Sequence, residues 1–258
     1  MSDDPLPPSS PTPAPGRPTV RTAAVIPAAG RGVRLGPGVP KALRALGGTP
    51  MLVHAVRAMA DSRAVSLVVV VAPPDGAGEV TSLLDAHALP ERTDVLVVPG
   101  GESRQESVKL GLDALPEGYD IVLVHDAARP LVPVDTVDAV VEAVRDGAPA
   151  VVPALPLADT VKQVEPAAAP GEPEPVVATP DRSTLRAVQT PQGFDRATLV
   201  RAHGTVTDDV TDDASMVEQL GLTVVTVPGH EEAFKVTRPL DLVLAEAVLA
   251  RRRLNDGF

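Results

Sequence analysis

The chain has 258 residues, of which 44% are apolar, and its formal net charge at pH 7 is −11. This length and apolar content suit one large α/β domain or two small ones, which excludes disorder throughout the chain. The negative charge and the scarcity of aromatic residues argue against a nucleic-acid partner, and the lack of Cys excludes disulfides and thiolate chemistry.

Proline dominates the N-terminal segment, MSDDPLPPSSPTPAPGRPTV. This segment lacks the apolar core of a signal peptide, so we predict that residues 1–20 form a disordered, solvated tail. A single domain is expected to follow at 21–258. The longest apolar runs, such as 68–72, have the length of a strand and fall far short of a membrane span. A cytoplasmic protein without a membrane anchor is the simplest expectation.

Short apolar runs alternate with longer amphipathic segments from residue 23 onward. Val137, Val140, Val141 and Val144 recur at the spacing of one helical stripe that faces a sheet. Because strand and helix patterns alternate throughout, we predict a doubly wound α/β fold with a mostly parallel sheet. The runs that are apolar on both faces, as buried parallel strands are, lie at 23–28, 66–74, 94–100, 120–128, 149–157 and 222–229.

Three polar runs follow three of the predicted strands. AAGRG follows the first strand, GGESRQES follows DVLVVP, and HDAARP closes the strand DIVLV. Ligands of such sheets bind beyond the carboxyl ends of the strands. We therefore expect the three runs to meet at one rim of the sheet and to form one site.

Residues 159–194 interrupt the alternation of strands and helices. Two strand-like pieces, at 161–164 and 176–178, are separated by four prolines and a glycine. This pattern predicts a protruding two-stranded arm with a loose tip, at about 159–187. A disordered linker between domains fits less well, because sheet and helix patterns resume in the same style afterwards.

The first polar run belongs to the loop VIPAAGRGVRLGPGVPK, residues 25–41. Glycine lets backbone N–H groups approach phosphate oxygens closely, so a loop of this kind after a strand can cradle phosphates. It matches neither a Walker loop nor the dinucleotide fingerprint, since Leu35 and Pro37 stand where glycines are required. The loop also carries two cations, Arg34 and Lys41. Such a loop can wrap a triphosphate and place both charges on it. Judged from the loop alone, they are equally consistent with ordinary surface cations.

This loop resembles the signature loop of the nucleotidyltransferases that activate sugar and polyol phosphates. Further runs occur in the order typical of one family: GGESRQESVKLGL (100–112), VHDAARP (124–130), DTVK (159–162), RSTLRAVQTPQGF (182–194), TDDA (211–214) and KVTRPLDL (235–242). Over roughly residues 22–252 the chain resembles the 2-C-methyl-D-erythritol 4-phosphate cytidylyltransferases of the non-mevalonate isoprenoid pathway. The resemblance implies a Rossmann-like nucleotidyltransferase fold and a reaction that joins CTP to the polyol phosphate and releases pyrophosphate.

The implied reaction needs no general base, because a phosphate monoester with a second pKa near ~6 is largely deprotonated at neutral pH. The enzyme must instead bring two anions together and stabilise charge at the α-phosphorus, which cations and a metal ion achieve. The resemblance implies that Arg34 and Lys41 stabilise the transition state on the triphosphate.

Asp126, at the end of a buried strand, is the best candidate ligand for Mg²⁺ or another divalent cation, because Mg²⁺ favours one or two carboxylates plus phosphate oxygens. The alternative is that Asp126 caps the next turn or pairs with Arg129. His125 has no second ligand at useful spacing, so we expect a packed or hydrogen-bonded histidine. Glu232, ahead of Lys235, is the second candidate ligand, although the family more often has Asp there.

Cytosine must be recognised by hydrogen bonds, because the chain lacks aromatic residues to sandwich it. For Arg104 the alternative is a surface cation in the first turn of a helix, and for Ser107 it is a serine on a helix surface. By resemblance, the residues expected to bind the nucleotide are Ala28, Ala29, Gly30, Gly101, Arg104 and Ser107.

The polyol phosphate needs its own binding residues. Thr160, Arg182 and Lys235 match family positions that hold this phosphate for attack, and two cations beside a hydroxyl suit a dianion. Family members are homodimers whose arms interlock, so that one subunit completes its neighbour's site. The resemblance therefore implies an obligate homodimer, with Thr160 and Arg182 flanking the arm.

TDDA is expected to start a helix, with Thr211 as the cap and with Asp212 and Asp213 near the positive end of the helix dipole. Two other functions remain open. A ribitol-5-phosphate cytidylyltransferase shares the loop, HDAARP and much of the arm. A nucleotide-binding regulator that has lost catalysis belongs to a different class, and the presence of the full set of charged candidates argues against it.

Overall fold

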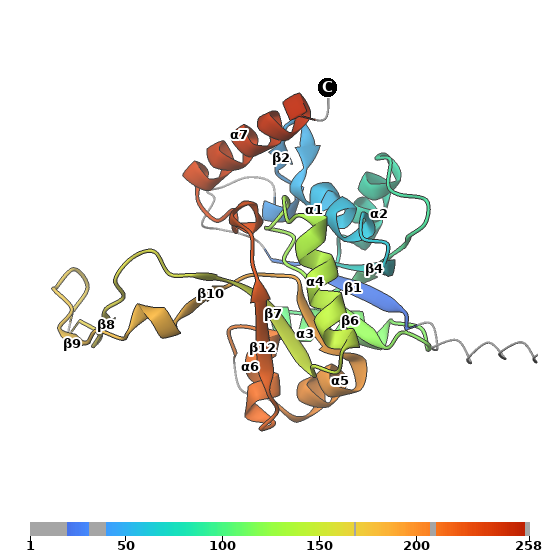
Figure 1. Ribbon diagram of the computed structural model, residues 1–258. Coiled ribbons are helices and arrows are strands. Elements are labelled where there is room, and N and C mark those ends of the chain that lie inside the picture. The colour runs from blue at the N-terminus through green and yellow to red at the C-terminus, as the bar shows by residue number, and fades with distance from the viewer. Residues whose placement is uncertain (1–19, 31–39, 168, 207–209, 256–258) are drawn as a thin grey trace, which may run out of the picture.

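The computed structural model describes residues 20–30, 40–167, 169–206 and 210–255. In these residues a central sheet carries helices on both faces, and a two-stranded arm projects from one side (Figure 1). The predicted tail at 1–20 lies outside the described residues except for Val20. The eight strands of the sheet are β1 (Thr22–Pro27), β4 (Val65–Ala72), β5 (Asp94–Pro99), β6 (Ile121–Val124), β7 (Ala150–Pro156), β10 (Arg186–Val188), β11 (Gln192–Asp195) and β12 (Val224–Pro228).

The strands follow the order β10-β7-β11-β6-β1-β4-β5, and β12 pairs with β7. β1 runs parallel to β4 and β6, β4 to β5, and β12 to β7, whereas β10 and β11 are antiparallel to their neighbours. All six predicted strands are present, so the prediction of a mostly parallel α/β sheet is confirmed. The sequence did not predict β11, which lies between β6 and β7, because this four-residue strand contains a glycine and no apolar run.

Helices cover the sheet on both faces because its central strands are apolar on both sides. Along β1, Ala24 and Ile26 belong to the core on one face and Ala23 and Val25 to the core on the other, which is the alternation a strand requires. The first core is covered by α1 (Met51–Ala60), α2 (Ala77–Asp85) and α4 (Val134–Arg145), and the second by α3 (Arg104–Asp113), α5 (Arg196–Thr205) and α6 (Asp213–Gln219).

The valine stripe predicted for one helix lies on α4. Val137, Val140, Val141 and Val144 are all buried against the sheet. The helical spacing in the sequence therefore identified the face of α4 that packs on the core.

The last helix, α7 (Pro239–Asn255), packs on a third, smaller core. Leu46 of the hairpin β2 (Ala45–Leu46) and β3 (Thr49–Pro50) contributes to this core, together with Met51, Leu131 and Val236. In Figure 1, α7 lies beside β2. This small core fixes the segment that connects β12 to α7.

The arm consists of β8 (Gln163–Val164) paired antiparallel with β9 (Val176–Ala178). Every residue of both strands is exposed, including Val176 with 57% of its surface. The arm projects away from the sheet in Figure 1, between β7 and the short 3-10 helix η3 (Arg182–Thr184). None of the helices in the described residues is both long and apolar enough to span a membrane.

Candidate active site

A pocket of about 280 Å³ opens at the carboxyl ends of β1, β5 and β6. It lies where the three polar runs were expected to meet, so their predicted convergence is confirmed. Residues that line the pocket include Ala28, Ala29 and Gly30 after β1, Gly101, Arg104 and Ser107 after β5, Asp126, Ala127 and Ala128 after β6, and Lys235.

The basic loop next to this pocket is only partly described. Arg34 lies in 31–39, outside the described residues. The backbone of Lys41 begins the 3-10 helix η2 (Lys41–Leu43), and its neighbour Ala42 lines the pocket. The side chain of Lys41 lies outside the described part of the chain, so the catalytic roles of these two cations stay predictions.

Side-chain hydrogen bonds order the N-terminus of α3 where it lines the pocket. Ser103 caps the helix by accepting the N–H of Glu106 at 3.0 Å, and the Glu106 carboxylate accepts the N–H of Glu102 at 2.8 Å. The Ser107 hydroxyl donates to the Ser103 carbonyl at 2.8 Å and accepts the N–H of Gly101 at 3.2 Å. Ser107 is 1% exposed, so it is not a helix-surface serine. Its hydrogen bonds to Gly101 and Ser103 order the loop between β5 and α3.

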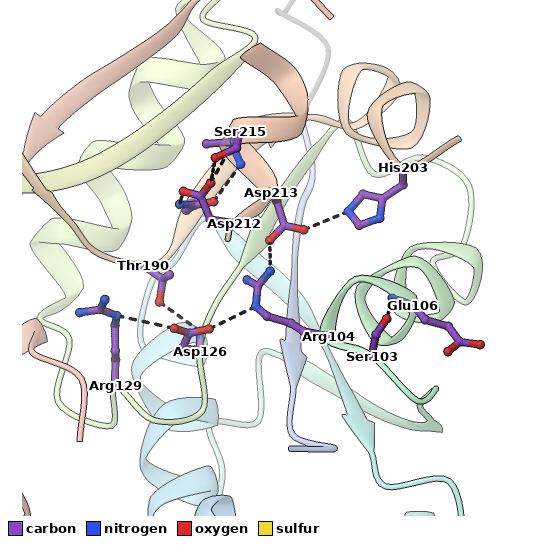
Figure 2. Close-up of polar contacts among 12 residues, drawn as sticks. Ser103, Arg104, Glu106, Asp126, Arg129, Thr190, His203, Asp212, Asp213 and Ser215 are labelled. Carbon is purple, nitrogen blue, oxygen red and sulfur yellow. Dashed lines mark hydrogen bonds and ion pairs between the residues drawn. The ribbon is translucent and has the colours of Figure 1, made fainter. Parts of the chain in front are cut away.

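Asp126 is surrounded by positive charge. Its carboxylate lies 2.8 Å from Nζ of Lys235, 3.7 Å from Nε of Arg104 and 3.9 Å from Nε of Arg129. Figure 2 shows Arg104 and Arg129 approaching it from opposite sides. Burial raises the pKa of Asp126, but Lys235 and the two guanidinium groups outweigh this effect and hold that pKa at about 2. The carboxylate is therefore ionised at neutral pH.

A buried histidine supports the backbone at Asp126. His125 is fully buried, with Nδ1 3.0 Å from the Thr190 hydroxyl and Nε2 3.1 Å from the Arg129 carbonyl. Because the carbonyl can only accept, Nε2–H donates to it, and Nδ1 accepts from the Thr190 hydroxyl, which itself accepts the N–H of Asp126 at 3.0 Å. Burial lowers the pKa of His125 to about 4, so the ring is neutral. The expectation of a hydrogen-bonded histidine is confirmed.

Arg129 joins the β6 loop to the segment that carries Lys235. Its guanidinium donates to the Ala233 carbonyl at 2.7 Å and to the Val188 carbonyl at 3.3 Å, and the N–H of Val236 donates to the Ala128 carbonyl at 2.8 Å. These bonds are shorter than the contact between Arg129 and Asp126. Arg129 therefore serves mainly to hold Lys235 beside the pocket.

Glu232, the second predicted metal ligand, is engaged elsewhere. Arg251 and Arg252 of α7 both contact its carboxylate, with Nε of Arg252 at 2.8 Å. Burial raises the pKa of Glu232, but these two arginines lower it below its ordinary value. Glu232 does not line the pocket, so its expected pairing with Asp126 is not found. The partners lie on a helix about twenty residues later, which no local pattern indicates.

The described residues offer no group of three or more metal-ligating side chains. Asp126 presents an ionised carboxylate among the cations at the pocket floor. This arrangement fits a magnesium ion that takes most of its ligands from phosphates, and it does not fit an all-protein cage.

Of the residues expected to bind the polyol phosphate, only Lys235 lines the pocket. Thr160 and Arg182 are exposed and flank the arm, where the Arg182 guanidinium contacts the Ala158 carbonyl. The structure of one chain therefore does not bring the three residues together.

TDDA begins a helix, but Thr211 is not its cap. Asp212 caps α6 by accepting the N–H of Ser215 at 3.0 Å, and it also accepts from Nε2 of Gln192 at 2.7 Å. Asp213, expected only to favour the helix dipole, is 1% exposed and forms an ion pair with Arg104 at 2.8 Å. Neither Thr190 nor Asp213 was predicted as part of the site. In the sequence, these two residues belong to the runs QTPQ and TDDA, but neither run reveals which of its side chains point inward.

Comparisons with known proteins identify the family of this chain. A family model, 2-C-methyl-D-erythritol 4-phosphate cytidylyltransferase, matches residues 22–251. A protein of that name from Streptomyces avermitilis is 87% identical over 258 residues, which cover 100% of both chains. The one from Streptomyces coelicolor is 84% identical over 243 residues, covering 94% of this chain and 90% of the relative.

Solved structures give the same result. The crystal structure of 2-C-methyl-D-erythritol 4-phosphate cytidylyltransferase from Thermus thermophilus matches with a TM-score of 0.68 and 36% identity, covering 87% of this chain and 97% of that chain. A 4-diphosphocytidyl-2C-methyl-D-erythritol synthase from Anaerococcus prevotii matches with a TM-score of 0.75 and 25% identity, covering 90% and 99%. Sequence and fold agree, and the chain belongs to the 2-C-methyl-D-erythritol 4-phosphate cytidylyltransferase family.

Proposed function

We propose that this protein transfers the cytidylyl group from CTP to 2-C-methyl-D-erythritol 4-phosphate and releases pyrophosphate, in the non-mevalonate isoprenoid pathway. Family membership over residues 22–251 supports this activity. The observation that carries it furthest is the 2.8 Å pair of Lys235 and Asp126 in a pocket next to the glycine-rich loop. An anion-binding cation and an ionised carboxylate thus face the same space.

The pocket supplies positioning and electrostatics. The attacking phosphate carries its own negative charge at neutral pH, so its oxygen can attack the α-phosphorus without a general base. Backbone groups after β1 and at Gly101 line the nucleotide end of the pocket, and Arg104 adds a fixed cation there. Lys235 holds the attacking phosphate close to this end, which lowers the entropic barrier to reaction. Arg34 and Lys41 are proposed to stabilise the charge that develops on the triphosphate.

Asp126 is the residue proposed to hold Mg²⁺ or another divalent cation together with phosphate oxygens. Bound there, the ion would supply Lewis-acid polarisation of the triphosphate. Asp126 suits this role because its pKa is held at about 2, so that the carboxylate stays ionised at neutral pH.

We also propose that the protein is a homodimer in the cytoplasm and that its subunits are joined through their arms. Val176 and Val177 of β9 expose 57% and 49% of their surface, which is unusual for valines in a strand unless another surface covers them. Thr160 and Arg182, which flank the arm, would then reach the pocket of a second copy. The arm provides a route by which these two residues join Lys235.

An assay of substrate choice tests the activity. Purified protein is given CTP and magnesium with either 2-C-methyl-D-erythritol 4-phosphate or ribitol 5-phosphate, and released pyrophosphate is measured. We expect turnover with the methylerythritol substrate, and a loss of about a hundredfold or more for Arg34→Ala and Lys41→Ala. Preference for ribitol 5-phosphate would reassign the substrate. Binding of CTP without turnover, unaffected by the two substitutions, would indicate a regulator.

A pair of substitutions tests the metal ligand. Asp126→Asn should lower kcat/KM by about a hundredfold or more and weaken its dependence on magnesium concentration, because a neutral amide binds Mg²⁺ poorly. Glu232→Gln is the matched control, since Glu232 lies on Arg251 and Arg252 and should leave the magnesium dependence unchanged. An unchanged magnesium dependence in Asp126→Asn, with a change in Glu232→Gln, would reverse the assignment.

A further inference from the structure

Asp213 is placed where its charge has no role in capping α6. Its neighbour Asp212 fills that role, with its carboxylate accepting both the N–H and the hydroxyl of Ser215. The Asp213 side chain points the other way, toward α3 and α5, as Figure 2 shows. The two acidic residues of TDDA therefore have different roles, and the role of Asp213 needs a separate explanation.

Asp213 is buried between two positively charged or polar partners. One oxygen lies 2.9 Å from Nε2 of His203, and the other lies 2.8 Å from Nη1 of Arg104. Burial of an unpaired carboxylate destabilises the folded state, and the two partners offset this unfavourable free energy. Burial raises the pKa of Asp213, but the hydrogen bond from His203 and the charge of Arg104 lower it below the ordinary value.

Arg104 has its own need for a carboxylate partner. It occupies the first turn of α3, where the positive end of the helix dipole repels a cation. It also lines the pocket, and its side chain is 35% exposed, so part of this side chain faces the pocket. The ion pair with Asp213 offsets the unfavourable dipole and sets the direction of the side chain.

The guanidinium lies between two carboxylates of unequal distance. Asp213 is at 2.8 Å and Asp126 at 3.7 Å, and Asp126 also binds Lys235 at 2.8 Å. Without the charge of Asp213, the nearest remaining anion for Arg104 among the described residues is Asp126. The guanidinium would then move toward Asp126, which lines the same pocket and already binds Lys235.

We propose that Asp213 is a positioning residue that, held by His203, sets the direction of the Arg104 guanidinium at the pocket and keeps it apart from Asp126. This inference rests on the proposed function, since it concerns how the same pocket takes a cytidine triphosphate. Asp213 does not touch the substrate in this scheme and acts only through Arg104.

Binding of CTP to Asp213→Asn tests the proposal directly. Asparagine keeps the shape of the side chain but removes its charge, so we expect the Kd for CTP, measured by calorimetry with magnesium, to rise about tenfold. The KM for CTP should rise with it, while the KM for the polyol phosphate changes less than about twofold. Asp212→Asn is the matched control, because it removes the same charge one residue earlier and asparagine still caps a helix. It should leave the Kd within about twofold of the unmodified protein.

A double-mutant cycle separates positioning through Arg104 from a general effect on folding. In an Arg104→Gln background, Asp213→Asn should raise the Kd for CTP by less than about twofold further. Fully additive effects of the two substitutions would overturn the proposal, as would an unchanged Kd in Asp213→Asn alone. If Asp213→Asn does not fold, His203→Gln decides. A rise of about threefold in the Kd for CTP supports the proposal, and an unchanged Kd overturns it.

Failure of the proposed function gives a different result. If the unmodified protein neither binds CTP nor releases pyrophosphate from it, the proposed activity is wrong. If it does both and Asp213→Asn behaves as the unmodified protein, only the positioning role is wrong.

Discussion

At the scale of single residues, burial and neighbouring cations have opposite effects on the pKa of two carboxyl groups at the site. Asp213 is buried and the side chain of Asp126 is only 12% exposed, which disfavours ionised carboxylates, and both are kept ionised by cations on other elements. Arg104 interacts with both of them. A single guanidinium thus links two anionic residues that lie far apart in the chain.

The buried histidine predicts a pH dependence of stability. Burial lowers the pKa of His125 to about 4, whereas an unfolded histidine titrates near 6.5. Between these values the unfolded chain takes up a proton that the folded chain does not, so stability falls as the pH falls through this window. The loss reaches at most about 3 kcal/mol near pH 4. Urea unfolding at several pH values, with EDTA present, measures it.

His125→Asn isolates this contribution. The amide does not titrate, and its oxygen can accept from the Thr190 hydroxyl in place of Nδ1, so we expect the slope of stability against pH to flatten between about 6.5 and 4. Asp126 contributes in a different window, since its stabilisation is lost only as the pH falls below about 4 toward its pKa of about 2. An unaltered slope in His125→Asn would contradict the assignment.

At the scale of elements, β11 decides how α4 packs on the sheet. Gly193 lies beneath α4, and a Cβ at this position would lie 2.4 Å from Cγ1 of Val140 and 3.1 Å from Cγ2 of Val144. The valine stripe of α4 therefore requires a residue without a side chain in the strand below it. A helical stripe and a glycine about fifty residues away form one packing unit.

Replacement of this glycine should destabilise the fold. Gly193→Ala introduces a methyl group into space already filled by the side chains of Val140, Val144 and Leu123, so we expect a loss of about 1–3 kcal/mol in the free energy of unfolding. Gly204→Ala is the matched control, because Gly204 lies in α5 with open space around its Cα, and alanine should stabilise that helix by about 0.5–1 kcal/mol. Thermal or urea unfolding measures both. Equal effects of the two substitutions would contradict the packing argument.

At the scale of the whole molecule, the arm separates two parts of the proposed phosphate site. Arg182 flanks the arm and Lys235 lines the pocket of the same chain. If arms are exchanged between subunits, an Arg182→Ala chain and a Lys235→Ala chain should complement each other. One of the two sites in each mixed dimer is then intact, and half of randomly mixed dimers are mixed, so activity should recover to about a quarter of the unmodified level.

The mixing experiment has a clear opposite outcome. Each variant alone should remain nearly inactive, and mixing without recovery would place Arg182 in the site of its own chain. Sedimentation of Val176→Asp provides the physical control, because a charge on β9 should weaken the dimer. If the unmodified chain sediments as a monomer at all concentrations, exchange of arms between subunits is ruled out.

The sequence alone determined the α/β class, the central strands, the inward face of α4 and the meeting of the polar runs at one rim. These features follow from local hydrophobic periodicity and from a general rule about the carboxyl ends of parallel strands. Asp126 could be chosen from sequence for the same reason, since it closely follows a buried strand.

Only the tertiary structure decided which partner each of these acidic residues has. Glu232 looked like a metal ligand in the sequence but binds Arg251 and Arg252 of α7, whereas Asp213 looked like part of a helix cap but binds Arg104. A carboxylate has the same local pattern in either setting, and its partner lies about twenty or more residues away. Long-range packing of helices, which no short window of sequence encodes, therefore determines where each charge is used.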